Sequence, residues 1–301
     1  MSHFRKESDW FVAQTMTAAA DWIQDQSRRQ PWLLWVDTFE IHERWHTPQY
    51  YVDLYDPDYS GLDLDFPNYN YIDIYKEKEI RRLRAHYAAE VTLTDRWVGH
   101  LLDQIDAMNL WDDTMVVLTS DHGMYLGEHR RMGKHTCDAA DPWPLYNEVS
   151  RIPLLVWIPR LKAQPKVEAL AQPADLMATI LDACGVAGPA IHGKSWIPLM
   201  KDSTESNWPA IFSSKHVGDN TNIDFCPTRL TVTTRDWTLI CPEEGLPAEL
   251  YSQREDMAQQ RDMAEAYPEL VERLSAMAVE FLRSQGASET YWARYASRRS
   301  S

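Results

Sequence analysis

Hydrophobic residues recur roughly every three or four positions in four stretches of the chain, a spacing typical of amphipathic helices. The pattern predicts helices over residues 8–26, 76–108, 173–184 and 268–284. Ser8 and Asp9 belong to the residue types that cap helix N-termini, and Gly185 stands where the end of a helix favours glycine. We therefore expect the first helix to begin beside Ser8 and the third to end before Gly185.

Short apolar runs lie between these helices, at residues 32–36, 114–119 and 153–158. All three runs predict β-strands, and the first two fit strands that are buried on both faces. Strands that alternate with helices favour an α/β sheet with helices on both of its faces. From about Asn207 the apolar runs become shorter, and residues 210–213, 228–233 and 237–241 predict a small antiparallel sheet before the last helix.

The predicted elements divide the chain into two parts. Residues 1–205 hold the α/β elements, and residues 206–301 hold the small sheet and the closing helix. Between the first strand and the second helix, residues 40–75 form a polar and aromatic stretch that is too long for a simple connection. Loops of this length are usually functional or pack over the surface as lids.

The composition limits the partners that the protein can have. The 301 residues carry a formal net charge of −15, and 44% of them are hydrophobic, which allows a sizeable core. The negative charge excludes nucleic acid as a partner, because binding to phosphates needs a basic surface. It still permits an anionic substrate, since a local cluster of cationic groups and metal can reverse the field inside one pocket.

Targeting signals are absent from the sequence. No apolar run reaches the length of a transmembrane helix, and the first residues lack the apolar core of a secretory signal, so we expect no membrane partner. A complete chain of this kind is expected in the cytoplasm, and one that lacks an upstream segment in the periplasm or outside the cell. The sequence indicates no oligomeric state. The four cysteines (137, 184, 226 and 241) have no zinc-ligand spacing and are expected to be ordinary thiols.

The strand at residues 114–119 runs directly into Ser120-Asp121-His122-Gly123. Ligands of open α/β sheets bind at the carboxyl ends of the strands, which is where Asp121 and His122 fall. Asp121 offers a hard oxygen to a divalent cation, and His122 offers a nitrogen. Gly123 allows the backbone to turn sharply beside them. The alternative interpretation is an ordinary turn at the end of a strand.

Further motifs follow at specific spacings. Residues 118–123, then Leu126-Gly127-Glu128-His129 and Gly133-Lys134, resemble the central block of the sulfatase family, in the alkaline phosphatase superfamily. Upstream, His42-Glu43-Arg44-Trp45 resembles the family's histidine-bearing loop, with Arg44 where proline is usual. Downstream, Tyr146-Asn147-Glu148 and Glu249-Leu250-Tyr251 resemble later segments of the family. The resemblance covers residues 8–285.

The resemblance implies a fold and a set of roles. The fold would be a partial alkaline-phosphatase-like α/β/α sandwich with a small C-terminal antiparallel sheet and a closing helix. Asp121 and His122 would ligate a divalent cation, usually Ca²⁺ in sulfatases. Because Ca²⁺ prefers oxygen ligands, Mn²⁺, Mg²⁺ or a contact of His122 with the substrate anion are the alternatives.

The resemblance also implies two residues that act on the substrate. Lys134 would bind a sulfate oxygen and stabilise charge in the transition state. His42 would lie near the leaving-group oxygen as a donor or general acid. The alternatives are a solvated loop lysine, and a loop histidine that packs among Trp45, Tyr50 and Tyr51.

Two further parts of a sulfatase site are absent from this sequence. They are the Cys/Ser-x-Pro-x-Arg motif, whose first residue becomes the formylglycine nucleophile, and an Asp-Asp pair that completes the metal site. Cys226-Pro227-Thr228-Arg229 has the wrong spacing to replace the first. We therefore expect a fragment of a longer enzyme, inactive alone, and the alternative is a complete but degenerate chain. In either case the shortened sheet is expected to expose apolar surface.

Three functions remain open from the sequence. The first is a sulfatase that hydrolyses a small-molecule or glycan sulfate ester. The second is a phosphonate monoester or phosphodiester hydrolase of the same superfamily, which the residues present do not distinguish from the first. The third is a non-catalytic protein that binds an anionic glycan, because the aromatic residues between Trp45 and Tyr71 suit stacking on sugar rings.

Overall fold

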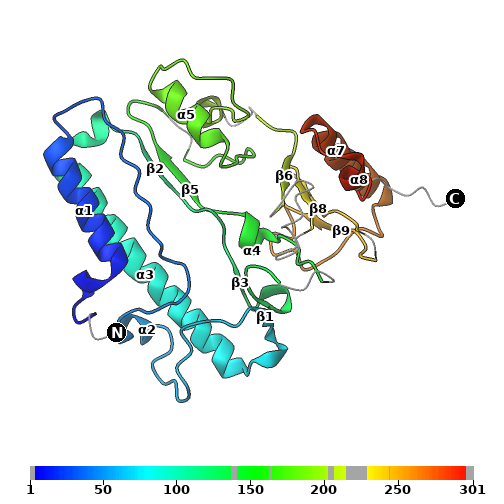
Figure 1. The fold of residues 1–301 in the computed structure, drawn as a ribbon, viewed down its shortest axis with the longest axis horizontal. Helices are drawn as coiled ribbons and strands as arrows, with labels where there is room; N and C mark the ends of the chain where they lie inside the picture. The colour runs from blue at the N-terminus through cyan, green and yellow to red at the C-terminus, as the bar shows by residue number, and fades with distance from the viewer. Residues whose placement is uncertain are drawn as a thin grey trace. The chain divides into compact units, whose positions relative to one another are not determined.

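The computed structural model describes residues 4–136, 141–162, 165–202, 207–214, 229–243 and 245–295. The chain, drawn in Figure 1, divides into two compact units. The first unit contains residues 1–115 and 126–133, and the second contains residues 116–125 and 134–301. The division predicted at residue 205 falls within residues 203–206, outside the described part, and stays a prediction.

The first unit is built on two long helices, as the helical spacing predicts. Helix α1 (Phe11–Gln26) packs against α3 (Glu77–Ala107), and the short helix α2 (Gln49–Val52) lies against α3 as well. Their apolar faces form one core, whose buried members are Trp10, Val12, Ala13, Met16, Tyr51, Val52, Ala85, Ala89 and Leu93. Burying each large side chain in such a core stabilises the fold by about 1.5–3 kcal/mol.

The start of α1 differs from the prediction. A 3-10 turn, η1 (Glu7–Asp9), precedes the helix. The N-cap residue of α1 is Trp10, whose side chain makes no hydrogen bond to the first turn of the helix. Asp9 instead accepts hydrogen bonds from the backbone of Arg5 and Lys6, within that turn. The Glu40 carboxylate caps α1 in place of Asp9, because its Oε1 atom accepts a hydrogen bond from the Val12 N–H at 3.1 Å. A residue distant in sequence thus caps the helix.

Short elements complete the first unit. Strand β1 (Asn70–Tyr71) pairs antiparallel with β4 (Arg131–Gly133), with Asn70 opposite Met132, in a sheet of order β1-β4-β3. Strand β3 (Tyr125–Leu126) lies where the chain passes into this unit. The remaining elements are single 3-10 turns: η2 (Ile72–Ile74), η3 (Leu110–Asp112) and η4 (Glu128–Arg130). The long stretch over residues 40–75 therefore contains α2, β1 and η2.

The strand predicted at residues 32–36 is wrong. The segment forms no strand, and Leu33 and Trp35 are 71% and 68% exposed, whereas Val36 packs against the core of the unit. Exposed and half-buried residues alternate along it, as in a strand with one covered face. A strand also requires backbone hydrogen bonds to a neighbour, and no described segment pairs with this one.

The second unit begins with two strands that the sequence predicts. Strand β2 (Val116–Thr119) pairs antiparallel with β5 (Leu154–Trp157) in a two-stranded sheet, with Leu118 opposite Leu155. The prediction that β2 is buried on both faces is wrong, because none of its residues is fully buried. The predicted exposure of apolar surface is confirmed, since Leu155 is 61% and Trp157 is 47% exposed.

Three helices follow in the second unit: α4 (Asn147–Ser150), α5 (Asp175–Ala183) and α6 (Ile197–Lys201). Helix α5 ends as predicted, with Gly185 at a φ of +64° just beyond its C-cap, Cys184. The free thiols among the described residues are those of Cys184 and Cys241, and positions 137 and 226 lie outside the described part.

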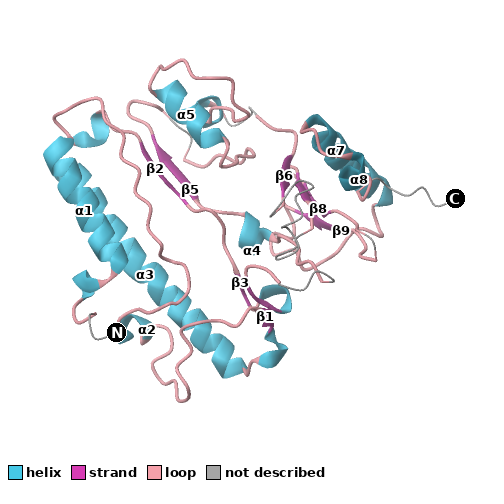
Figure 2. Cartoon of the chain, viewed as in Figure 1, coloured by secondary structure: helices cyan, strands magenta, loops and turns pink. Residues whose placement is uncertain are grey.

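The predicted small sheet and closing helix are confirmed (Figure 2). Four antiparallel strands stand in the order β6-β7-β8-β9: β6 (Ile211–Ser213), β7 (Thr231–Thr233), β8 (Trp237–Ile240) and β9 (Glu249–Ser252). Helix α7 (Pro268–Ser284) packs on this sheet, and α8 (Glu289–Trp292) follows it. Their shared core contains Leu230, Val232, Leu239, Leu250, Leu274, Ala278 and Leu282, all less than 2% exposed. Strand β9 was not predicted as a strand.

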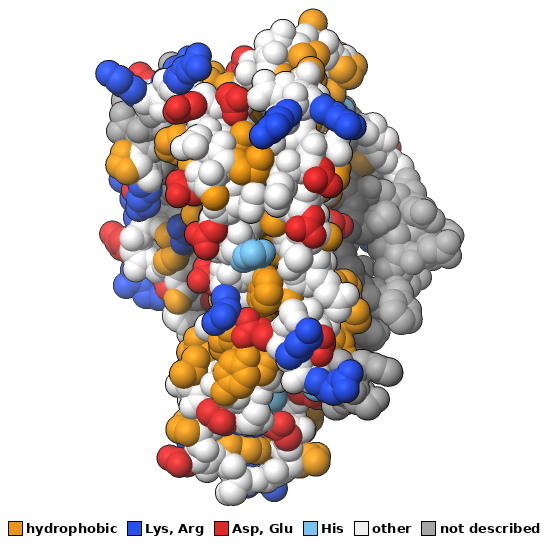
Figure 3. Space-filling model, turned by 90° about the vertical axis from the view of Figure 1, so that its left-hand side faces the viewer, with side chains coloured by type: hydrophobic (Ala, Val, Ile, Leu, Met, Phe, Trp, Pro, Cys, Tyr) orange, Lys and Arg blue, Asp and Glu red, His pale blue; other side chains and the backbone are white. Residues whose placement is uncertain are grey.

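One side of the molecule carries charges of both signs among hydrophobic side chains. Figure 3 views the side on which α1 lies in Figure 1, and shows acidic and basic side chains interleaved with hydrophobic ones. Such interleaving presents no field of a single sign on this side. Among the described helices, none is both long and apolar enough to cross a membrane.

A buried carboxyl group on α3 makes the stability of the first unit depend on pH. Glu90 is only 3% exposed. Burial, and secondly the nearby Glu40 carboxylate, raise the pKa of Glu90 to about 8. Because the pKa is raised in the folded state, the neutral group contributes stability that is fully present below the ordinary value of 4.5. This contribution is lost as the pH rises through about 8.

We expect Glu90→Gln to make the protein progressively more stable than the wild type as the pH rises, by roughly 3 kcal/mol between about pH 5 and pH 8. Glutamine keeps the shape of the side chain and cannot ionise. Urea denaturation at several pH values measures the difference. Asp95→Asn, at an exposed position of the same helix, is the control and should show no such trend. A constant difference between Glu90→Gln and the wild type would contradict the prediction.

Candidate active site

The sequence motif at the end of β2 forms a compact turn. The Oδ1 atom of Asp121 accepts the backbone N–H of His122 at 2.8 Å, and its Oδ2 lies 3.3 Å from Nε2 of His122. The hydroxyl of Ser120 donates to the backbone oxygen of His122 at 3.2 Å. The Asp121 side chain is 82% exposed. The turn thus presents a carboxylate and an imidazole together at the carboxyl end of a strand.

Gly123 anchors this turn to α4. Its N–H donates to the carbonyl oxygen of Val149 at 2.9 Å. A Cβ atom at position 123 would lie 2.1 Å from the carbonyl oxygen of Glu148, so no side chain fits there. The need for glycine comes from this close backbone approach, and not from a left-handed conformation, because Gly123 is not among the glycines with positive φ.

Asp121 and His122 do not by themselves form a cation site. Ca²⁺ takes about six to eight oxygen ligands, whereas this pair supplies one carboxylate and one imidazole. Within the part of the chain that the structure describes, no group of three or more His, Cys, Asp or Glu residues gathers as metal ligands do. The metal role of the pair therefore stays a prediction, and it requires further ligands.

Lys134 follows β4 directly and is half-buried. The residue before it, Gly133, has a φ of +110°, in the region that favours glycine. A Cβ atom at position 133 would lie 2.5 Å from Cγ and Cδ1 of Tyr69, so the tyrosine ring rests on the Gly133 backbone. The position of Lys134 thus depends on a glycine and an aromatic ring that belong to the first unit.

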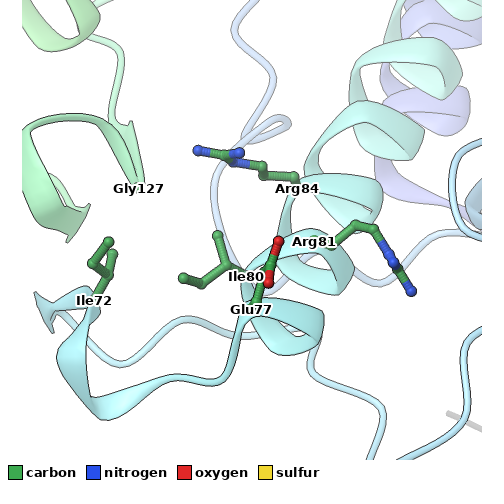
Figure 4. A pocket seen from close by; sticks show the side chains of 6 residues that line it. All are labelled: Ile72, Glu77, Ile80, Arg81, Arg84 and Gly127. Carbon is green, nitrogen blue, oxygen red and sulfur yellow. The ribbon is translucent and has the colours of Figure 1, made fainter.

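The hairpin that leads to Lys134 is also held by α3. In Figure 4, Arg84 extends from α3 toward Gly127, while Arg81 points away. The Nε atom of Arg84 donates to the carbonyl oxygen of Leu126 at 2.6 Å. A Cβ atom at Gly127 would lie 2.8 Å from Nη2 of Arg84, and Gly127 has a φ of +112°. A cavity of about 370 Å³ lies beside this contact.

His42 lies in the first unit with a defined ring orientation. Its Nδ1 lies 2.6 Å from the carbonyl oxygen of Glu43, and its ring stacks on Phe39 with centroids 4.3 Å apart. The predicted alternative, packing among Trp45, Tyr50 and Tyr51, stays untested. The Trp45 ring lies edge-on to Tyr87, and its indole N–H donates to the carbonyl oxygen of Ile41 at 3.2 Å, while the hydroxyls of the two tyrosines donate to Glu7.

The structure brings Asp121 and His122 together, and places them in the same unit as Lys134. His42 belongs to the other unit, so a common site of all four residues stays a prediction. Sequence reasoning missed Glu43 and Tyr69, the residues that surround His42 and Gly133. The sequence offers one sign of Glu43, which is a carboxylate directly beside the candidate histidine. The glycine before the candidate lysine indicates a close contact at that position, but it does not identify Tyr69 as the partner.

Two motifs that are distant in sequence meet in the second unit. The hydroxyls of Tyr146 and Tyr251 both donate to Oε2 of Glu249, at 2.5 and 2.8 Å, and Arg229 pairs with the other carboxylate oxygen at 2.5 Å. Burial raises the pKa of Tyr251, with the charges of Tyr146 and Glu249 as further causes. The Asn147 N–H donates to Oε1 of Gln259 at 2.7 Å. This network joins the segment before α4 to β9.

The α/β elements, the Asp121-His122 pair at the end of β2 and the separate small sheet agree with the alkaline phosphatase superfamily, the class that the sequence motifs resemble. Comparison with known proteins identifies the family within it. The family model described as Sulfatase matches residues 8–186, and the one described as N-sulphoglucosamine sulphohydrolase, C-terminal, matches residues 138–281. The chain belongs to the sulfatase family, whose members generally use a metal ion and a formylglycine.

Individual relatives agree with this assignment. Arylsulfatase K of Gallus gallus is 28% identical over 212 residues, which are 66% of this chain and 37% of that protein. The multifunctional alkaline phosphatase superfamily protein PehA of Trinickia caryophylli is 34% identical over 135 residues, 44% of this chain and 25% of that protein. The matched stretches therefore span well under half the length of these relatives.

A solved structure confirms the predicted fold. The structure of BT4656 in complex with its substrate D-glucosamine-2-N,6-O-disulfate aligns with a TM-score of 0.72 at 16% identity. The alignment covers 91% of this chain and 69% of that chain. The alkaline-phosphatase-like α/β architecture thus extends over nearly the whole chain.

Proposed function

We propose that this chain is part of a sulfuric ester hydrolase that acts on a small-molecule or glycan sulfate ester. The observation that carries the proposal is the Asp121-His122 turn, locked onto α4 through Gly123 within the stretch that matches the sulfatase family. The substrate of BT4656, a sulfated amino sugar, supports a sulfated glycan as the substrate class.

Each candidate residue has a role in this proposal. Asp121 and His122 supply two ligands of a divalent cation, with Ca²⁺ as the preferred ion, and the remaining ligands come from other residues. The Lys134 ammonium group binds a sulfate oxygen and offsets its negative charge. Because a carbonyl oxygen can only accept a hydrogen bond, Nδ1 of His42 donates to the backbone oxygen of Glu43. The other ring nitrogen, Nε2, is then the one that gives a proton to the leaving group.

The test compares two substrates on the natural protein that contains this chain. We expect 4-nitrophenyl sulfate to be hydrolysed with a higher kcat/KM than bis(4-nitrophenyl) phosphate. Lys134→Ala should lower kcat/KM for the sulfate by about 100-fold, because a charge-stabilising group is lost. The control is Lys162→Ala, at an exposed position, which should leave the rate unchanged.

The opposite outcomes decide between the alternatives. Faster hydrolysis of the phosphodiester would favour a phosphonate monoester or phosphodiester hydrolase, a function that the similarity to PehA supports. Turnover of neither ester, together with binding of a sulfated glycan, would favour the non-catalytic alternative. An unchanged rate in Lys134→Ala would remove that residue from the site.

A further inference from the structure

We propose that Glu43 and Tyr69 are positioning residues that couple the His42 loop to the strand leading to Lys134. The inference rests on the proposed function for its catalytic meaning, whereas the coupling itself can be tested without any activity. It is built from three contacts inside the first unit, each of which holds the next.

The first contact fixes the imidazole of His42 against Glu43. Besides the 2.6 Å contact of Nδ1 with the backbone oxygen, Nδ1 lies 3.6 Å from Oε2 of the Glu43 carboxylate. The Glu43 side chain is only 5% exposed, and the His42 side chain is 38% exposed. A buried carboxylate beside a half-exposed imidazole can therefore set the direction in which the ring faces.

The second contact holds the Glu43 carboxylate. The hydroxyl of Tyr69 donates a hydrogen bond to its Oε1 atom. Hydrogen bonds to a charged acceptor are roughly twice as strong as those between neutral groups, and a buried carboxylate that loses a donor is costly. Tyr69 thus fixes the carboxylate that lies beside the imidazole.

The third contact joins Tyr69 to the strand before Lys134. In the β1–β4 ladder Asn70 lies opposite Met132, and Tyr71 lies opposite Arg131. Continuing this antiparallel register by one residue places Tyr69 opposite Gly133, and the 2.5 Å approach of its ring to the Cβ position of Gly133 agrees. An aromatic ring that covers a glycine across a sheet pins the register of the strands.

The result is a continuous set of contacts from the imidazole to the residue before Lys134. Arg84 holds the other end of the same hairpin, at Leu126, and the Tyr69 contact fixes the end next to Lys134. A misplacement of about 1 Å at a reacting group can cost up to about 100-fold in rate. A residue pair that fixes two segments at once is therefore worth testing for an effect on kcat.

The first experiment follows hydrogen–deuterium exchange in peptides that cover residues 39–46 and 126–134. In Tyr69→Phe, which keeps the ring and removes the hydroxyl, we expect both peptides to exchange about tenfold faster than in the wild type. Glu43→Gln should act in the same direction. The matched control is Tyr50→Phe, which removes another tyrosine–glutamate hydrogen bond, to Glu7, and should change neither peptide.

The second experiment measures the hydrolysis of the sulfate ester by the natural protein that contains this chain. We expect Tyr69→Phe to lower kcat about tenfold and to leave KM within about twofold, because positioning and not binding is lost. Faster exchange in residues 39–46 alone would overturn the coupling. Faster exchange in both peptides with an unchanged kcat would overturn the positioning role. A wild type without turnover would refute the proposed function, and the exchange result would still decide the coupling.

Discussion

Replacing Gly123 by alanine should lower the free energy of unfolding by about 3 kcal/mol, at the upper end of what overpacking costs. The added methyl carbon would lie 2.1 Å from the carbonyl oxygen of Glu148. Neither group can rotate away, because the position of a Cβ atom is fixed by the backbone and the carbonyl oxygen is part of the backbone. The turn that carries Asp121 would have to leave α4 and give up the Gly123–Val149 hydrogen bond. Urea denaturation measures the loss.

A second glycine provides the control. Gly99 lies within α3, and a Cβ atom there would meet no atom within 4 Å. Because alanine favours a helix over glycine by about 1 kcal/mol, Gly99→Ala should raise the free energy of unfolding. The same substitution is thus expected to lower the free energy of unfolding at position 123 and to raise it at position 99. A Gly123→Ala protein as stable as the wild type would show that the turn does not pack on α4.

Asp175→Ala is expected to be the most destabilising change, at about 3–5 kcal/mol. Asp175 is 0% exposed, and its carboxylate accepts hydrogen bonds from four N–H groups. They are the backbone N–H groups of Gln172 and Lys194 and the indole N–H groups of Trp196 and Trp208, at 2.9–3.3 Å. Alanine would leave these buried donors without their acceptor, and each unsatisfied donor costs about 1–3 kcal/mol.

Thermal denaturation followed by tryptophan fluorescence measures this effect, because two of the donors are tryptophans. Asp175→Asn keeps one acceptor oxygen and should lie between alanine and the wild type. Asp182→Ala is the control, since Asp182 is exposed near the C-terminus of the same helix, where a negative charge is unfavourable. A loss in Asp175→Ala no larger than that in Asp182→Ala would contradict a structural role for the buried carboxylate.

Features that depend on local spacing were predictable from the sequence. Helices α1 and α3 follow from their apolar positions, and the sharp end of α5 follows from Gly185. Residues 32–36 show the limit, because an apolar run does not reveal whether a neighbouring strand exists to pair with it. Strand β9 could not be predicted for another reason, since Glu249–Ser252 is only four residues long and shows no alternation of buried and exposed positions.

In the candidate site, too, contacts between neighbouring residues were predictable and contacts between distant residues were not. Asp121 and His122 are adjacent, so their sequence already contains their geometry. The contact of Tyr69 with Glu43 spans 26 positions, and that of Trp208 with Asp175 spans 33. No periodicity marks such pairs, because they are created when separate elements pack. The residues that hold a site in place are therefore harder to predict than the residues that form it.

The interleaving of the two units has a consequence for how such a gene can be divided. Residues 116–125 belong to the second unit, and residues 126–133 return to the first. A single junction placed inside residues 116–133 would therefore leave both resulting pieces without part of a unit. Exchanging one whole unit for that of a relative requires three junctions, after residues 115, 125 and 133. A chimaera joined at one point within this stretch therefore contains at least one unit built from both parents.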